Sequence, residues 1–117
     1  RESRDGVDGW RINGTKMWIT GMHVATHCAT FARTSGNDGD ARGITCFLVP
    51  TGTPGMTVDE YMWTFNMPTD HPRMTFRGVW VPDSAILGIE GRGLSLAQSF
   101  VHQNRIRQAA SSLGAAT

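Results

Sequence analysis

The sequence has few features of a membrane protein, a nucleic-acid-binding protein or a disulfide-stabilised domain. No apolar run among its 117 residues approaches the roughly 20 residues that a transmembrane helix needs. The formal net charge is +1 and no basic run exceeds two residues, which excludes an extended electrostatic surface for nucleic acid. The two cysteines, Cys28 and Cys46, form no CxxC pair. We expect both to be reduced, buried, small apolar side chains.

The composition is that of a folded, turn-rich protein. Hydrophobic residues make up 39% of the chain, charged residues 18%, and there are 14 glycines. This length suits one domain, or one domain with a piece of another. The first residues are of mixed charge and match neither a signal nor a transit peptide. The chain begins at Arg1 without Met and ends at Thr117 within a helical pattern, so we expect a fragment of a longer protein.

Strand-like runs separated by short turns dominate the first 82 residues. Asn13-Gly14 separates two of them and is the preferred centre of a type I′ hairpin. Parallel pairing would need long crossovers, which are absent. We therefore predict a mainly β fold, an antiparallel barrel or sandwich of about six strands followed by one C-terminal α-helix. The expected strands are residues 10–13, 14–20, 28–34, 44–50, 56–61 and 73–82.

The character of the sequence changes after residue 93. Residues 94–113 contain neither Pro nor Gly, and their apolar residues recur at three- and four-residue steps. This spacing predicts an amphipathic helix, entered through Gly91 and Gly93. Such a helix must pack on the β-domain or on helices outside this chain.

One short run, residues 14–20, combines a large indole with a nearby hydroxyl. Alternation along a strand would place Lys16, Trp18 and Thr20 on one face, and Met17 and Ile19 on the other. We therefore expect Met17 and Ile19 in the core. The other three residues would form a wall for a flat, polar ligand, although a Trp in such a run is also typical of a structural barrel aromatic.

Several motifs follow one another along the chain with compatible spacing. They are "INGTKMWITG", "FART", "GITCFLVPTGTPGM", "FRGVWVPDSAILG", and "GRGLSLAQSF" followed by "NRIRQAASSLGAA". This ordered set resembles the middle part of an acyl-CoA dehydrogenase. The resemblance implies a middle β-domain over residues 1–89 and the first helix of a C-terminal helical bundle over 90–117. It also implies FAD as cofactor and α,β-dehydrogenation of an acyl-CoA thioester.

The resemblance also implies partners and a location. An electron-transfer flavoprotein would accept the electrons, and the full-length protein would be a homodimer or homotetramer. The expected location is the bacterial cytoplasm or the mitochondrial matrix. An acyl-CoA oxidase or a flavin-dependent monooxygenase of the same superfamily remains an alternative, as does a non-catalytic β-barrel binding module without flavin.

By this likeness the flavin ring lies against Trp18, Ile19 and Thr20. The indole offers a flat apolar face, and Thr20 offers its hydroxyl or backbone to the N5 edge of the flavin. The family's Gly-, Ser- and Thr-rich flavin loop, which precedes this region, is absent from the chain.

The same likeness places acyl-CoA contacts on the helix. They fall on His102, Gln103, Asn104 and Arg105. Many members carry an acidic residue at the place of His102, and some carry the catalytic Glu at the place of Asn104. An amide has no useful pKa for proton abstraction, so we expect no catalytic base in this chain. Arg105 fits a pocket cation and a surface residue equally.

Three other patterns are interpreted as structural. His23, His27 and Cys28 have a spacing that could bind zinc on a helix, but they fall in a connector. Asp70-His71 lies between prolines and is interpreted as a polar loop pair. Arg42 could meet a phosphate but is interpreted as a solvated loop residue.

Overall fold

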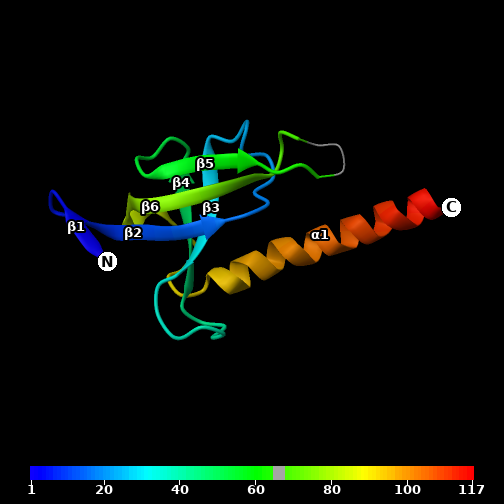
Figure 1. Cartoon of the computed structure of the whole chain (residues 1–117). Coiled ribbons are helices and arrows are strands. Elements are labelled where there is room, and N and C mark those ends of the chain that lie inside the picture. Colours follow the sequence, from blue (N-terminus) through cyan, green and yellow to red (C-terminus); the bar gives the residue numbers. More distant parts are fainter. Residues whose placement is uncertain (65–67) are drawn as a thin grey trace.

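The computed structural model describes residues 1–64 and 68–117 and shows two antiparallel sheets with one C-terminal helix. One sheet has the order β1-β2-β6-β5 and the other β3-β4-β7. Strands β3 and β4 cross β2 and β6 steeply, as in an orthogonal sandwich (Figure 1). The predicted fold class is confirmed. The elements are β1 (Glu2–Arg4), β2 (Val7–Lys16), β3 (His27–Arg33), β4 (Ile44–Pro50), β5 (Met56–Tyr61), β6 (Pro72–Pro82), a 3₁₀ turn (Asp83–Ala85), β7 (Ile86–Leu87) and α1 (Gly93–Ala116).

The predicted hairpin at Asn13-Gly14 is wrong, because β2 runs through this dipeptide as one strand. The tight hairpin lies instead at Asp5-Gly6, between β1 and β2, where Arg4 pairs with Val7. Both turn residues have positive φ, 50° for Asp5 and 78° for Gly6, as a type I′ turn requires. The sequence therefore offers two dipeptides of the same turn chemistry, and only one of them turns.

At Asn13 the ladder between β2 and β6 contains a β-bulge. Ile12 pairs with Val79 and Gly14 with Phe76, so two residues of β6 lie opposite Asn13. Gly78 takes a left-handed φ of 63°, and its backbone N–H donates to Asn13 Oδ1 at 2.7 Å. The Asn13 side chain thus supplies a hydrogen bond that the irregular ladder does not.

The core lies between the two sheets. Phe47 and Val49 of β4 and Met74, Val79 and Val81 of β6 are each at most 2% exposed. The rings of Trp10 and Phe47 lie 5.8 Å apart in a tilted arrangement, which is a favourable aromatic contact. Alternating inward residues of the two sheets therefore close one apolar interior, as the strand patterns predict.

Helix α1 contacts β4 near its start, and its C-terminal part projects from the β-domain (Figure 1). The Gly91 N–H donates to Thr45 Oγ1 at 2.9 Å, and Gly91 O accepts from the Gly43 N–H at 3.1 Å. A half-buried stripe follows Leu94, Ala97 and Val101. The large apolar residues exposed on the helix are Leu96, Phe100, Ile106 and Leu113.

In the part of the chain that the structure describes, no helix combines the length and hydropathy needed to span a membrane.

Candidate functional site

The segment of Trp18, Ile19 and Thr20 begins a connector, not a strand. β2 ends at Lys16, and Trp18 takes a left-handed φ of 61°. The prediction that strand alternation aligns Lys16, Trp18 and Thr20 is therefore wrong, because period-two alternation requires extended backbone. Met17 is 47% exposed and is not a core residue, whereas Ile19 packs against the core.

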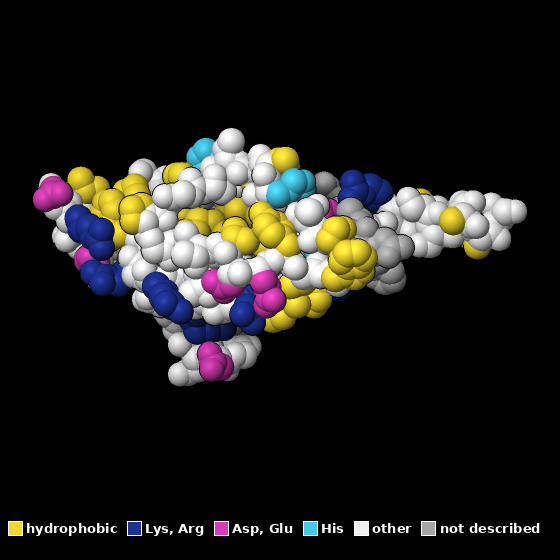
Figure 2. Space-filling view, turned by 45° about the horizontal axis from the view of Figure 1, so that its top comes forward, with side chains coloured by type: hydrophobic (Ala, Val, Ile, Leu, Met, Phe, Trp, Pro, Cys, Tyr) yellow, Lys and Arg dark blue, Asp and Glu magenta, His cyan; other side chains and the backbone are white. Residues whose placement is uncertain are grey.

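The Trp18 indole is 53% exposed, so it is not sunk in the interior of the β-domain. A bulky residue in the left-handed region is a backbone outlier that costs roughly 1–2 kcal/mol. Such conformations persist where the surrounding structure fixes them, and they concentrate at functional sites. The space-filling view shows hydrophobic side chains gathered along the middle of one face of the molecule (Figure 2). The exposed indole of Trp18 and the hydroxyl of Thr20, two residues later, bring an apolar surface and a polar group to the same connector.

Hydrogen bonds hold this connector against the start of β6. The Ile19 N–H donates to Pro72 O at 3.3 Å, and the Gly21 N–H donates to Asp70 O at 3.0 Å. Thr20 Oγ1 lies 2.9 Å from His71 Nδ1. Residues 70–72 thus support the Trp18 segment from outside its own stretch of sequence, which strand patterns alone do not indicate.

A second candidate site lies where α1 leaves the sheets. A hollow of about 480 Å³ separates the loop before β4 from the first three turns of the helix. Arg42, Arg92, Ser95, Ser99 and His102 are among its lining residues. Arg42 is exposed, in keeping with its interpretation as a solvated loop residue, but it also borders this hollow.

The four residues expected on the helix do not share one face. His102, Gln103 and Arg105 are all exposed and Asn104 lies half-buried, but only His102 of the four borders the hollow. Neighbours on a helix point about 100° apart, so consecutive residues cannot all meet one ligand surface. His102 and Arg105, three residues apart, lie on the same side of the helix.

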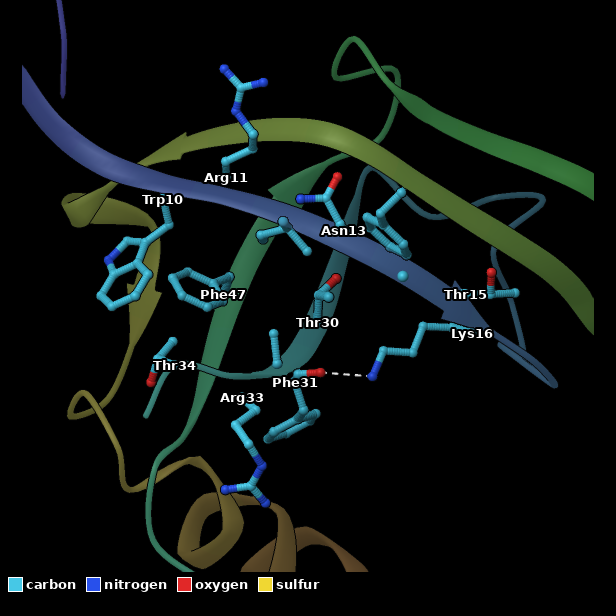
Figure 3. A pocket seen from close by; sticks show the side chains of 14 residues that line it. Trp10, Arg11, Asn13, Thr15, Lys16, Thr30, Phe31, Arg33, Thr34 and Phe47 are labelled. Atoms are coloured by element: carbon cyan, nitrogen blue, oxygen red, sulfur yellow. Dashed lines mark hydrogen bonds between the residues drawn. The ribbon is translucent and has the colours of Figure 1, made fainter. Parts of the chain in front are cut away.

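A third cavity, of about 390 Å³, opens between β2 and β3 and was not anticipated from the sequence. β1 pairs only with the first three residues of β2, so the rest of that edge borders the cavity. Figure 3 shows Trp10 and Phe47 at one end and Lys16 at the other. The Lys16 ammonium crosses the gap and donates to Phe31 O at 2.7 Å. The cavity exists because β2 and β3 lie apart in the folded molecule, and no sequence motif indicates that separation.

The most perturbed carboxyl group belongs to surface ion pairs, not to the Trp18 segment or the helix hollow. Hydrogen bonds from Arg11 and then Arg4 lower the pKa of Glu2 to about 2. Asp59 accepts a 2.6 Å hydrogen bond from Thr75 Oγ1, which lowers its pKa. Glu2 and Asp59 therefore form ion pairs and hydrogen bonds on the surface of the sheet and are not candidates for catalysis.

Buried cysteines and possible metal ligands complete the survey of reactive groups. Cys28 and Cys46 are both free and buried, and burial raises the pKa of the Cys46 thiol. His23 Nδ1 lies 3.4 Å from Asp70 Oδ1. Within residues 1–64 and 68–117, no three His, Cys, Asp or Glu side chains are grouped to hold a metal ion.

Known proteins match both the sequence and the fold. A family model described as "Acyl-CoA dehydrogenase, middle domain" matches residues 2–79, two thirds of the chain. The chain belongs to the acyl-CoA dehydrogenase family. The mitochondrial short-chain specific acyl-CoA dehydrogenase of Rattus norvegicus is 32% identical over 115 residues. The match covers 97% of this chain and 28% of that enzyme, so the chain spans just over a quarter of such relatives.

Bacterial members of the acyl-CoA dehydrogenase family match as well. The short-chain specific acyl-CoA dehydrogenase of Megasphaera elsdenii is 34% identical over 108 residues, covering 92% of this chain and 28% of that enzyme. Its butyryl-CoA dehydrogenase structure superposes with a TM-score of 0.71 at 32% identity, over 82% of this chain and 24% of that one. The FAD complex of PigA gives a TM-score of 0.69 at 26% identity, over 77% and 24%.

Proposed function

We infer that this chain is the flavin-facing part of an FAD-dependent acyl-CoA dehydrogenase. The observation that carries the proposal is the placement of Trp18, half exposed in a left-handed conformation where β2 ends. Ile19 anchors the segment in the core, and Thr20 presents a hydroxyl beside it. This pairing suits the isoalloxazine ring, and a matched structure holds FAD. When bound, FAD would accept hydride from the acyl thioester.

The chain's own residues would bind and orient the ring. The exposed indole would cover one side of it and exclude water, as an aromatic side chain does at a flat ligand. Thr20 would hold a hydrogen bond at the polar N5 edge. Since an amide cannot take the α-proton, Asn104 is not the base, and we assign the base to a carboxylate outside these residues.

We propose that the hollow beside α1 receives part of the acyl-CoA substrate. Arg42 and Arg92 bring two positive charges to it, and Ser95, Ser99 and His102 bring hydrogen-bonding groups. Arginine guanidinium groups suit phosphate oxygens. Of the helix residues inferred from the family likeness, His102 has the best support, because it borders the hollow. Gln103 and Arg105 do not border it and would contact substrate only if further parts of the protein cover them.

In a protein of the relatives' full length, residues 1–89 would form the middle domain and 90–117 the first helix of the helical bundle. The expected electron acceptor is an electron-transfer flavoprotein, as the family likeness implies. We expect a homodimer or homotetramer, located in the bacterial cytoplasm or the mitochondrial matrix, as the matched relatives include mitochondrial and bacterial enzymes.

The test uses the full-length protein that contains this chain. We expect flavin absorbance at about 450 nm after purification, and bleaching of that band by an acyl-CoA under anaerobic conditions. Trp18→Ala should slow flavin reduction or reoxidation. Val24→Ala is the control, because Val24 is a 75% exposed apolar residue of the same connector. The isolated 117 residues should hold flavin weakly, because the family's upstream flavin loop is not part of them.

A colourless protein that cannot be reconstituted with FAD would contradict the proposal and favour a binding module without flavin. Unchanged rates of both half-reactions in Trp18→Ala would remove Trp18 from the site. Rapid reoxidation by oxygen in place of an electron-transfer flavoprotein would indicate an oxidase or a flavin-dependent monooxygenase. A matched structure, the prolyl acyl carrier protein oxidase AnaB, makes this outcome a specific alternative, with a TM-score of 0.69 at 29% identity over 79% of this chain and 24% of that one.

A further inference from the structure

Thr20 has a neighbour that the family likeness does not assign, the imidazole of His71. The two side chains are 51 positions apart in sequence, and Thr20 Oγ1 lies 2.9 Å from His71 Nδ1. A threonine hydroxyl has one proton and two lone pairs. If the hydroxyl donates to the imidazole, its proton is used; if it accepts from the imidazole, its proton stays free for another partner.

His71 is itself held in place by its surroundings. Its carbonyl oxygen accepts from the Met62 N–H at 3.0 Å, and Pro72 follows it at the start of β6. On the other side, the Thr20 N–H donates to Trp18 O at 3.1 Å, within the same tight connector. Both partners of the Thr20–His71 contact thus sit on constrained backbone, and this favours one stable geometry.

The charged neighbours are engaged elsewhere. Asp70 Oδ1 accepts from the Gly21 N–H at 3.0 Å and lies 3.4 Å from His23 Nδ1. The carboxylate therefore holds the backbone of the connector, while the imidazole of His71 meets the hydroxyl. Asp70 and His71 therefore do not act as one polar loop pair, because each contacts a different group of the connector.

We propose that His71 is a positioning residue that orients the Thr20 hydroxyl toward the flavin, an inference that rests on the proposed function. Oxidised flavin presents a hydrogen-bond acceptor at N5, so Thr20 must donate its proton there. Thr20 can do so only if His71 Nδ1 carries a proton and donates to Thr20 Oγ1. The proposal therefore requires the Nδ1–H tautomer of His71 and a Thr20 hydroxyl proton that points away from the imidazole.

The first measurement reads the hydrogen bond by NMR, without an activity assay. In the flavin-loaded full-length protein with isotopically labelled histidine, ¹⁵N shifts of the His71 ring identify the protonated nitrogen. We expect a protonated Nδ1, and faster hydrogen exchange at the Thr20 and Gly21 amides in His71→Ala. His71→Asn should restore slow exchange, because its amide places a hydrogen-bonding group near the position of Nδ1. A bare Nδ1 on neutral His71, or exchange unchanged by His71→Ala, would overturn the inference.

The second measurement is a double-mutant cycle in the flavin-loaded full-length protein, with anaerobic stopped-flow measurement of flavin reduction by acyl-CoA. His71→Ala should slow reduction by about threefold to tenfold, the effect of one lost hydrogen bond, with substrate KM unchanged. Thr20→Val should slow it at least as much, and adding His71→Ala to Thr20→Val should change nothing further. His71→Asn should recover most of the rate.

The two proposals fail in different ways. Additive effects of Thr20→Val and His71→Ala would show that His71 does not act through Thr20, and would leave the flavin site intact. A protein with no flavin would overturn the proposed function, whatever the ring shifts of His71 show.

Discussion

Gly93→Ala should weaken the attachment of α1 to the β-domain. Gly93 is the first residue of the helix and is buried against β4. A Cβ at this position would lie 2.9 Å from both Cys46 N and Ile44 O, and 3.0 Å from Thr45 C. All three atoms belong to the β4 backbone, so no side chain can rotate away to make room.

Two effects of opposite sign set the magnitude. Alanine is favoured over glycine in a helix by up to about 1 kcal/mol, and less at the first residue. Overpacking against rigid backbone costs about 1–3 kcal/mol. The clash should therefore dominate, with a net loss of about 1–2 kcal/mol in the free energy of unfolding. Gly114→Ala is the matched control, since nothing lies within 4 Å of a Cβ there and only the helix preference remains.

Urea denaturation, followed by circular dichroism at the helix band and by tryptophan fluorescence, measures both variants. With a urea m-value of about 2 kcal/mol/M, the middle of the usual range, Gly93→Ala should lower the midpoint by about 0.5–1 M. Gly114→Ala should leave it unchanged or raise it slightly. A midpoint of Gly93→Ala at or above that of the parent chain would show that the helix can pivot on β4. That result would refute the inference that Gly93 fixes the position of α1 and thereby the shape of the hollow beside it.

Three further predictions test the core, the surface charges and the cysteines. Phe47→Ala should lower the free energy of unfolding by about 3–5 kcal/mol in chemical denaturation, because Phe47 is only 1% exposed; a loss below 1 kcal/mol would place the core elsewhere. The pKa of Glu2 falls from 4.5 to about 2 on folding, so its stabilising effect is complete above pH 4.5 and is lost as the pH falls toward 2. Arg11→Ala should flatten this acid limb in pH-dependent unfolding, and an unchanged limb would contradict the assignment. Cys28 and Cys46 should react with a thiol reagent only as fast as the chain opens, because both are buried, and rapid labelling of the native chain would disprove this.

The strand predictions held where the apolar pattern was long. The runs that became β3, β4, β5 and β6 agree with the structure to within a residue or two. They carry β-branched and aromatic residues bounded by Gly, Pro, Asn or Asp. The preference of these residues for strands and turns depends on neighbouring residues, so it can be recognised in the sequence. The short strands β1 and β7 were missed because two or three residues carry too little pattern.

The dipeptides Asp5-Gly6 and Asn13-Gly14 show why turns were harder to place. Either one has the chemistry of a type I′ turn. Residues on both sides of Asn13 pair with β6, more than 60 positions away, and this ladder keeps the backbone extended there. A long-range pairing therefore overrode a local preference, and the sequence held no signal to rank the two.

In the candidate site, too, local sequence indicated the residues and only the fold showed their arrangement. Trp18, Ile19 and Thr20 could be named from the family motif, but their arrangement could not, because strand alternation fails where Trp18 turns left-handed. His71 was set aside as a loop residue, since nothing in a linear pattern brings it to Thr20.

The sequence by itself determined the fold class, the apolar interior and the family, because hydrophobic periodicity, turn chemistry and ordered motifs are properties of neighbouring residues. Only the tertiary structure decided which dipeptide turns, how far β2 extends, and which distant side chain meets the Thr20 hydroxyl. These depend on contacts between residues tens of positions apart. Such contacts outweigh the local preferences of a few residues, and they form only when the chain folds, so the sequence pattern does not indicate them.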